Sequence, residues 1–358
     1  MRSQSRRVLG LALSGLFVVS ACSGTAATPV PTAAPSATPA GSTAPSEAPS
    51  TGPTEMPGTK EFKIAFTSPG LSTSPFLAAI DDLNKNGGYK IEYTVLDASE
   101  LLAEGVASGE FAFASGANNG ILKAVAKGAN IKAITARVNN EWTLYARNDI
   151  TSCAGLAGKR VAIHSAGAVS TAMVKNYIAE NCPGTEPEYF VIEGSPNRVA
   201  AMLADQIDAS PLELSDSLTI DTQAGDRYAM LTSFVTDLPD LQTTSVYVNG
   251  NFARENPGTV VALIKALLAQ HTKIDGNPAY LKQIAETYVK DAINAETIDA
   301  ATQKYVELKM FPTDGGITNE KMQYTAEFFG PDGTGATENV VPLVQWVDLT
   351  FLEMALAQ

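Results

Sequence analysis

The sequence has few of the residues that most enzymes use for catalysis. Its 358 residues include only two histidines, His164 and His271, and three cysteines. It contains no His-Glu-x-x-His motif, no Cys/His metal spacing, no Gly-x-Ser-x-Gly motif and no Walker A loop. His164 ends an expected strand and could line a cleft, whereas His271 is expected only to pack. These absences argue against an enzyme, a metal centre and a bound cofactor.

Positive charge is also scarce. The chain has 25 Lys and Arg residues against 38 Asp and Glu residues, a formal net charge of −13. A protein that binds nucleic acid needs a basic face to displace counterions, and no dense Lys/Arg cluster occurs beyond the first seven residues. We therefore expect no nucleic-acid partner. The apolar fraction of 45% is enough for one large or two medium cores.

The N-terminal segment has the pattern of a secretion signal. Arginines precede an apolar run from Val8 to Val19, which is too short to cross a bilayer core of about 30 Å as a helix and so argues against a transmembrane anchor. The following Val19-Ser20-Ala21-Cys22 resembles a bacterial lipobox. We expect residues 1–21 to be a lipoprotein signal peptide and Cys22 to be lipidated at the cell membrane. The alternative is ordinary cleavage nearby, which releases a free secreted protein.

Residues 22–59 have the composition of a tether. Eight prolines fall within residues 23–59, among mostly Ser, Thr, Ala and Gly, and no aromatic residue occurs there. Such a segment cannot bury enough apolar surface to offset the entropy lost on ordering. We expect an extended tether that lets a folded body range over the membrane. Its Ser and Thr content is compatible with O-glycosylation, which the sequence does not establish.

The folded body begins near Lys60 with strand-like runs that alternate with helical patterns. These runs cover residues 62–66, 91–95, 111–114, 131–135, 160–164 and 189–192. Alternation of this kind predicts an α/β fold with mostly parallel sheets. Beyond residue 257 the pattern becomes mainly helical, and we expect these helices to pack onto an existing sheet rather than to build a new one.

Cys153 and Cys182 bracket one strand and one helix of this pattern. A strand followed by a returning helix brings its two ends to the same side of a sheet, so a disulfide is geometrically reasonable. It would stabilise the fold by about 3 to 4 kcal/mol. The alternative is a pair of buried thiols. A catalytic cysteine is less expected, because neither cysteine neighbours a histidine in sequence and the expected compartment is oxidising.

Small polar loops follow three of the expected strands. They cover residues 67–75, 115–119 and 164–171, each at the carboxyl end of a strand and the start of a helix. In open α/β sheets ligands bind at this edge, where free N–H groups and the helix dipole attract anionic or carbonyl oxygens. Each loop taken alone could be a plain helix N-cap. Three in one chain favour a binding site.

Several segments in a fixed order resemble a known family over residues 60–358. The segments are Ser74-Pro75-Phe76, Ala107-Ser108-Gly109-Glu110-Phe111-Ala112, Leu156-Ala157-Gly158-Lys159-Arg160-Val161-Ala162, Gln206-Ile207-Asp208-Ala209, Phe252-Ala253-Arg254-Glu255-Asn256-Pro257 and Val347-Asp348-Leu349-Thr350-Phe351-Leu352. Their order is similar to that in the solute-binding proteins of nitrate, sulfonate, taurine and thiamine-precursor ABC importers, the NMT1/THI5-like family.

The resemblance implies a two-lobe, type II periplasmic-binding-protein fold. Residues 60–146 and 244–358 would form lobe 1, with the helical C-terminal segment completing it, and residues 147–243 would form lobe 2. The implied protein is a monomer outside the cytoplasm, with a small-molecule ligand and ABC permease subunits as partners. The ligand would bind in the cleft between the lobes and shift the protein to a closed form that the permease recognises.

The resemblance also implies which residues bind the ligand. They are Ser68, Thr73, Ser115, Gly116, Asn118, Asn140, Trp142, Ser165, Gly167, Ser170, Thr171 and Glu213. The three loops named above contain no Arg or Lys, so an anion would depend on backbone and hydroxyl donors. Glu213 would repel an anion and favour a ligand with N–H donors, and Trp142 offers a stacking face.

We therefore expect a small, flat, partly apolar organic solute of the sulfonate, pyrimidine or aromatic-carboxylate class rather than nitrate. Two other functions stay open. One is an enzyme of the thiamine-precursor type on the same scaffold, although the sequence lacks the iron-binding or cysteine-rich apparatus that it needs. The other is a surface lipoprotein that senses a ligand and presents it to a receptor.

Overall fold

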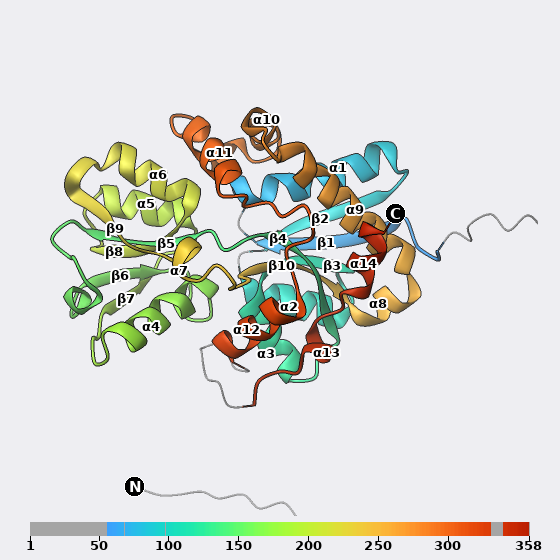
Figure 1. Ribbon diagram of the computed structural model, residues 1–358, viewed down its shortest axis with the longest axis horizontal. Helices are drawn as coiled ribbons and strands as arrows, with labels where there is room; N and C mark the ends of the chain where they lie inside the picture. Colours follow the sequence, from blue (N-terminus) through green and yellow to red (C-terminus); the bar gives the residue numbers. More distant parts are fainter. Residues whose placement is uncertain (1–55, 68, 97, 331–338, 358) are drawn as a thin grey trace, which may run out of the picture. The chain divides into compact units, whose positions relative to one another are not determined.

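The computed structural model describes residues 56–67, 69–96, 98–330 and 339–357, which belong to one compact unit. Two five-stranded sheets organise this unit, and Figure 1 shows them side by side. The first sheet has the strand order β2 (Lys90–Leu96), β1 (Glu61–Thr67), β3 (Phe113–Ala117), β10 (Thr244–Asn249), β4 (Ile131–Val138). The second has the order β7 (Glu188–Val191), β6 (Arg160–Ile163), β8 (Ala209–Glu213), β5 (Trp142–Arg147), β9 (Tyr228–Ser233).

Both sheets are mostly parallel, as the sequence predicts, and each contains one antiparallel strand. β10 runs against β3 and β4, and β5 runs against β8 and β9. Each of these two strands is the first that the chain forms after it crosses from one sheet to the other. Before each crossing the chain runs along a strand that points toward the gap between the sheets, and after it along a strand that points away from the gap. The carboxyl ends of the parallel strands of both sheets therefore face each other.

We call the part of the chain around the first sheet lobe 1 and the part around the second sheet lobe 2. β5 begins at Trp142 and pairs entirely within the second sheet. β10 begins at Thr244 and pairs with β3 and β4 of the first sheet. The lobe boundaries at residues 147 and 244 stay a prediction. β4 is followed directly by β5, without the intervening helix that the alternating pattern leads one to expect.

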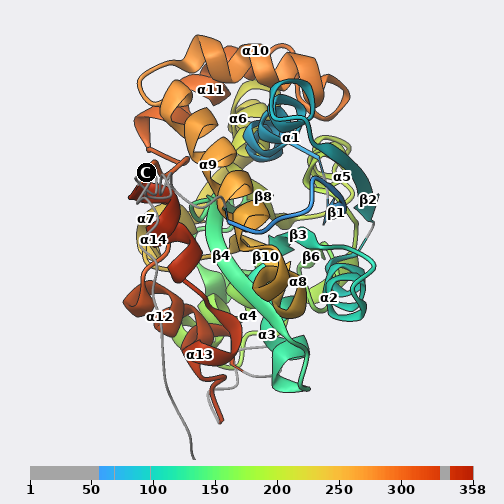
Figure 2. The same ribbon diagram turned by 90° about the vertical axis from the view of Figure 1, so that its right-hand side faces the viewer.

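The helices of lobe 1 are α1 (Ser74–Asn86), α2 (Ser99–Ser108), α3 (Asn118–Ala126), α8 (Gly250–Glu255), α9 (Pro257–Ile274), α10 (Pro278–Tyr288), α11 (Ile298–Glu307), α12 (Asn319–Phe329), α13 (Leu343–Trp346) and α14 (Thr350–Leu356). α9 packs on α1 and α14, and α14 also contacts β4 (Figure 2). The C-terminal helices thus cover the first sheet, and among the described residues after Pro257 a single isolated bridge, from Val347 to Ala133, adds to it. This confirms the sequence expectation.

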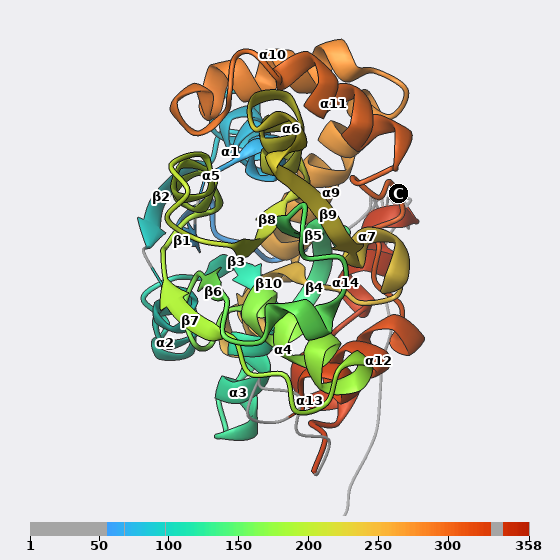
Figure 3. The same cartoon turned by 90° about the vertical axis from the view of Figure 1, so that its left-hand side faces the viewer.

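The helices of lobe 2 are α4 (Val169–Asn181), α5 (Ser195–Leu203), α6 (Leu214–Gln223) and α7 (Phe234–Asp237). Four 3₁₀ turns complete the described elements: η1 (Leu71–Thr73), η2 (Cys153–Leu156), η3 (Gly225–Arg227) and η4 (Lys290–Ala292). α6 packs against α11 of lobe 1, and Figure 3 shows the two helices next to each other. No described helix is both long and apolar enough to cross a membrane.

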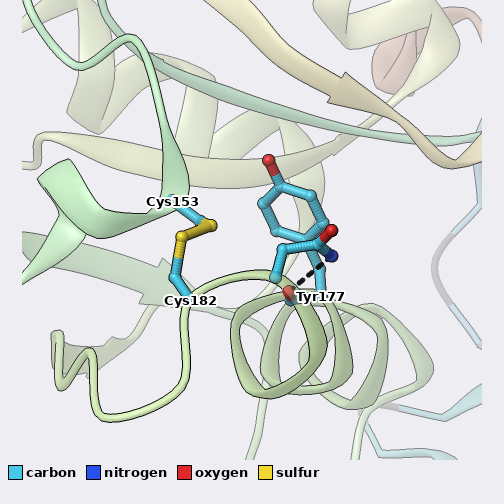
Figure 4. The surroundings of a disulfide bond; sticks show 4 residues. Cys153, Tyr177 and Cys182 are labelled. Carbon is cyan, nitrogen blue, oxygen red and sulfur yellow. Dashed lines mark hydrogen bonds between the residues drawn. A yellow bond between two sulfur atoms is a disulfide. The ribbon is translucent and has the colours of Figure 1, made fainter.

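Cys153 and Cys182 form a disulfide with a Cα–Cα distance of 5.9 Å. Cys153 opens η2, and Cys182 follows the last residue of α4. Figure 4 shows the bridge with Tyr177 of α4 beside it. The strand-and-helix argument from the sequence therefore identifies the correct pair.

The described chain begins with residues that the sequence assigns to the tether. The backbone N–H of Gly258 donates to the Pro57 carbonyl at 2.8 Å, and the Thr259 hydroxyl donates to the Thr59 carbonyl at 2.6 Å. The first turn of a helix has N–H groups without an intrahelical partner, and the Pro57 carbonyl accepts one of them at the start of α9. The folded body thus extends to Met56, four residues before Lys60.

Candidate ligand site between the two sheets

A cavity of about 60 Å³ lies where the carboxyl ends of the strands of the two sheets face each other. Both lobes and the crossing between them contribute to its lining. The lining residues are Thr67, Gly116, Ala117, Arg137, Glu141, Trp142, His164, Ala168, Val169, Ser170, Ser195, Arg198, Glu213 and Thr244. Pockets for drug-sized ligands have volumes of about 300 to 1,000 Å³. In this conformation the cavity therefore accepts only a small chemical group.

Lobe 1 contributes Arg137 to the cavity. The side chain projects from β4, a strand whose residues are nearly all buried, and is itself 6% exposed. Its Nη2 lies 3.4 Å from Ser72 Oγ, while Nε and Nη1 have no hydrogen-bond partner among the described residues. Burial lowers the pKa of Arg137, and the nearby Glu141 and Glu213 oppose that shift. A guanidinium stays charged in proteins, so Arg137 brings positive charge and free donors to the site.

Lobe 2 contributes Arg198, which is fully buried in the first turns of α5. Its Nε donates to the Pro211 carbonyl at 3.1 Å and its Nη1 to the Ile192 carbonyl at 3.2 Å. With these bonds in place, the guanidinium carbon Cζ lies 6.0 Å from the ring centroid of Trp142. Nη2 has no partner among the described residues. Burial lowers the pKa of Arg198 to about 10, which still leaves it charged at neutral pH.

Carboxyl groups balance these cations. Glu141 is buried at the crossing between β4 and β5 and accepts a hydrogen bond from Tyr305 Oη at 2.5 Å. Burial raises its pKa, while Arg137 lowers it. Burial also raises the pKa of Glu213 well above its usual range, and Glu141 and Asp216 raise it further. For Asp216 burial raises the pKa to about 6.

Three further residues of the lining, Trp142, Ser170 and His164, carry polar side-chain groups. The Trp142 Nε1 and Ser170 Oγ atoms are buried and have no hydrogen-bond partner among the described residues. The His164 Nδ1 accepts a hydrogen bond from the Gly194 N–H at 3.0 Å. The ring proton of neutral His164 is therefore on Nε2, and burial lowers the pKa of this imidazole. The unpaired groups of this site are mainly donors.

Four of the predicted ligand residues line the cavity: Gly116, Trp142, Ser170 and Glu213. Seven others are described but lie outside its lining, namely Thr73, Ser115, Asn118, Asn140, Ser165, Gly167 and Thr171. Ser68 and the expected lipidation residue Cys22 lie outside the described residues.

Most of these seven residues take part in contacts within the protein. Asn118 donates from Nδ2 to the Gln242 carbonyl and accepts from Tyr247 Oη, and Asn140 donates to the Phe234 carbonyl at 2.8 Å. Thr171 Oγ1 donates to the Ser165 carbonyl at 2.8 Å. Ser115 and Gly116 belong to β3 itself, because this strand runs to Ala117 rather than ending at Ala114 as expected.

Two more of the seven lie elsewhere around the gap. The Gly167 carbonyl accepts a hydrogen bond from Asn119 Nδ2 at 2.6 Å, which joins lobe 2 to α3 of lobe 1. Thr73 is fully buried in the turn before α1, and its Oγ1 has no partner among the described residues. A ligand role stays a prediction for all of these residues, including the four in the lining.

The expectation that an anion would find only backbone and hydroxyl donors is wrong. It considered the loops after the strands, which contain no Arg or Lys, but Arg137 lies within a strand and Arg198 within a helix. A signal was present in the sequence. Arg137 interrupts the otherwise apolar end of Ile131–Val138, and an unpaired charge in a buried strand calls for a function or a partner. Glu141, also missed, follows four residues later.

Among the described residues, no cluster of three or more His, Cys, Asp or Glu residues is placed to hold a metal ion. The site instead combines two guanidinium groups with hydroxyl, indole and imidazole donors. Such a set is suited to hold an acceptor-rich group without a metal ion.

Two lobes around an interlobe cavity define the class: the chain has the type II periplasmic-binding-protein fold. Solved structures support this class. The chain is 13% identical to the ligand-binding component of an ABC-type import system from Staphylococcus aureus, with a TM-score of 0.67 over 83% of this chain and 99% of that one. It is 15% identical to the alkanesulfonate-binding protein SsuA from Xanthomonas axonopodis pv. citri bound to MOPS, with a TM-score of 0.60 over 78% and 95% of the chains.

The sequence profile described as NMT1/THI5-like matches residues 85–279, and the chain belongs to this family. The nitrate-binding protein NrtA from Synechocystis PCC 6803 is a further structural neighbour, 14% identical, with a TM-score of 0.54 over 69% of this chain and 71% of that one. No curated protein matches the sequence.

Proposed function

We propose that this chain is the extracytoplasmic solute-binding component of an ABC importer and that it captures a small organic anion between its lobes. The family assignment and the fold support the general role. Structural neighbours that carry out this role include a component of an ABC-type import system and an alkanesulfonate-binding protein.

The observation that carries the proposal is the pairing of Arg137 with Arg198. One guanidinium comes from each lobe, both line the same cavity, and both have N–H groups without a partner among the described residues. A buried donor without a partner costs about 1 to 3 kcal/mol, and more when it is charged. An oxyanion between the two side chains would satisfy these donors and tie the lobes together.

The solute class follows from the donors. A sulfonate or carboxylate group offers two or three acceptor oxygens and matches a guanidinium fork. The Trp142 Nε1 and Ser170 Oγ would add two neutral donors to the same group. This proposal keeps the sulfonate and carboxylate members of the class expected from sequence and sets aside the pyrimidine, because the unpaired donors need acceptors.

The mechanism is capture and delivery, and it requires no covalent step. The solute would bridge the lobes and shift the protein toward the closed form, which permease subunits can then recognise. A lipid on Cys22 and a tether between Cys22 and the start of the folded body at Met56 would keep the protein close to its permease and raise its local concentration there. The protein would act as a monomer at the outer side of the cell membrane.

Isothermal titration against a panel of solutes tests the proposal. The panel contains methanesulfonate, benzenesulfonate, benzoate, nitrate and an aminopyrimidine. We expect a sulfonate or a carboxylate to bind, and Arg198→Gln to weaken its binding at least about thirtyfold, the equivalent of about 2 kcal/mol for a lost buried charge contact. Arg137→Gln should behave similarly.

Arg254→Gln is the matched control, because it removes the same charge from an exposed side chain outside the cavity. It should change the dissociation constant less than twofold, on the order of the effects seen for exposed charges. Thermal melts verify that each variant is folded. Binding of the aminopyrimidine with no binding of any anion would refute the proposed solute class.

A further inference from the structure

The Glu213 carboxyl group lies at the face where the two lobes meet. Glu213 ends β8 of lobe 2, and a Cβ atom placed on Gly70 of lobe 1 would lie only 3.3 Å from Glu213 Oε2. The carboxyl therefore reaches across to the loop after β1. In a form with the lobes apart, this contact would be lost and water would surround the carboxyl.

Charged and titratable groups face Glu213 from every element packed around it. They are Arg137 of β4, Glu141 at the crossing, Arg198 of α5, Asp216 of α6 and Tyr305 of α11. His164, which follows β6, lines the same cavity, and burial and Arg198 lower its pKa. With all three carboxyls ionised and both arginines charged, the group would carry a net charge of −1. A solute anion would bring this to −2 in a cavity of about 60 Å³.

An excess of buried negative charge of this size is unfavourable, and groups in such sites take up a proton instead. Glu213 is the carboxyl best placed to do so. Arg137 stabilises the ionised form of Glu141, and Asp216 has a pKa of about 6, whereas Glu213 is raised well above its usual range by burial and by both neighbouring carboxyls.

We propose that Glu213 takes up one proton from solvent when the lobes close on a solute anion, and that its neutral carboxyl then donates a hydrogen bond to a solute oxygen. This inference rests on the proposed function. It makes Glu213 a specificity residue, since a protonated carboxyl contributes a donor to an oxyanion while an ionised one would repel it. Two guanidinium groups and this one carboxylic acid would together surround the bound head group.

The direction of the pH dependence follows from linkage. With the lobes apart, Glu213 is ionised above its ordinary pKa of 4.5, and in the closed complex it stays protonated up to its raised pKa. Between these two values one proton is taken up per solute. The dissociation constant should therefore rise about tenfold for each unit of increase in pH, and it should level off above the raised pKa.

Calorimetric titration of the full chain with methanesulfonate and benzenesulfonate tests this inference, from about pH 5 to about pH 8 and in buffers of different ionisation enthalpy. Both probes stay ionised throughout, so any proton taken up belongs to the protein. We expect wild-type binding to take up about one proton more than Glu213→Gln binding does. The amide of Glu213→Gln donates a hydrogen bond at every pH. The dissociation constant of this variant should therefore lack the wild-type rise of about tenfold per pH unit.

Glu188→Gln is the matched control, since it removes a carboxylate from an exposed position on β7 and should keep the wild-type dependence. Binding with the same proton uptake in wild type and Glu213→Gln overturns this inference and leaves the proposed function intact. If the variant does not fold, the titrations of the wild type in different buffers still test the inference: zero proton uptake on binding would overturn it. If neither probe binds at any pH, the inference fails. If no anion of the solute panel binds either, the proposed function fails as well.

Discussion

The two lobes share one sheet topology but are stabilised by different means. In lobe 1 the strands β3, β10 and the edge strand β4 are almost completely buried, and α9, α13 and α14 contact β4, whereas the other edge strand, β2, is largely exposed. In lobe 2 the edge strand β7 is largely exposed, and β9, which has the sheet position of β4, is exposed or half-buried after Tyr228. A separate cluster of ten buried residues packs on the face that carries α5 and α6.

Lobe 2 also contains a disulfide and a carboxylate that two arginines share. The disulfide joins η2 to the end of α4. On the opposite side, Asp208 accepts hydrogen bonds from Arg160 and Arg147 at 2.8 to 3.0 Å, and these bonds hold its pKa far below the usual range. A small unit buries a smaller fraction of its surface and requires additional ties. The comparison indicates that lobe 1 is stabilised mainly by apolar packing, whereas lobe 2 also depends on its disulfide and on the ion pairs of Asp208.

The largest effect should come from the apolar layers of lobe 1. Phe113→Ala removes a fully buried ring whose centroid lies 5.2 Å from that of Phe62 and 5.4 Å from that of Phe252. We expect a loss of about 3 to 5 kcal/mol in the free energy of unfolding, from the lost burial and the cavity left behind. Denaturant titration followed by circular dichroism measures it.

Phe190→Ala, the same change on the 44%-exposed Phe190 of lobe 2, should cost less than about 0.5 kcal/mol. Equal losses in the two variants would contradict the contrast between a buried first sheet and an exposed edge of the second.

The next effect in size is removal of the disulfide. Cys153→Ala combined with Cys182→Ala opens a loop that spans 29 residues in sequence, and we expect the unfolding free energy to fall by about 3 to 4 kcal/mol because the unfolded chain gains freedom. Hydrogen exchange locates the effect: amides around α4 and η2 should exchange faster while those of β3 and β10 keep their protection.

Reduction of the wild-type protein provides an independent control, because it should reproduce the behaviour of the double variant without changing the sequence. If amide exchange became faster by the same factor in both sheets, the disulfide would not act on lobe 2 in particular. This result would contradict the proposed difference between the lobes.

Local patterns were sufficient to predict the fold class, most strands and the cysteine pair. Runs such as Ile131–Val138 are apolar because both faces of the sheet are covered, and such runs are visible in sequence. β9 was harder, since Tyr228–Ser233 is an edge strand whose apolar run, Tyr228 to Leu231, is short. The crossing into lobe 2 was predicted from the family resemblance, and in the structure the polar residues Asn139, Asn140 and Glu141 separate β4 from β5.

The site was predictable only in part. Glu213, Ser170, Gly116 and Trp142, which line the cavity, are among the residues that the family resemblance implied. Arg137 and Arg198 escaped because they lie inside regular elements, and only the tertiary fold brings these two residues, 61 positions apart, to one cavity. Their charges reversed the inferred preference for a donor-bearing solute.

The central claim is that the two lobes close on an anion held by one arginine from each. Small-angle X-ray scattering of the full chain, with and without a saturating sulfonate, tests it most directly. The account predicts that the radius of gyration falls when benzenesulfonate binds to the wild type and stays constant in Arg137→Gln combined with Arg198→Gln. An unchanged radius at saturation, or equal binding and closure in the double variant, would contradict it.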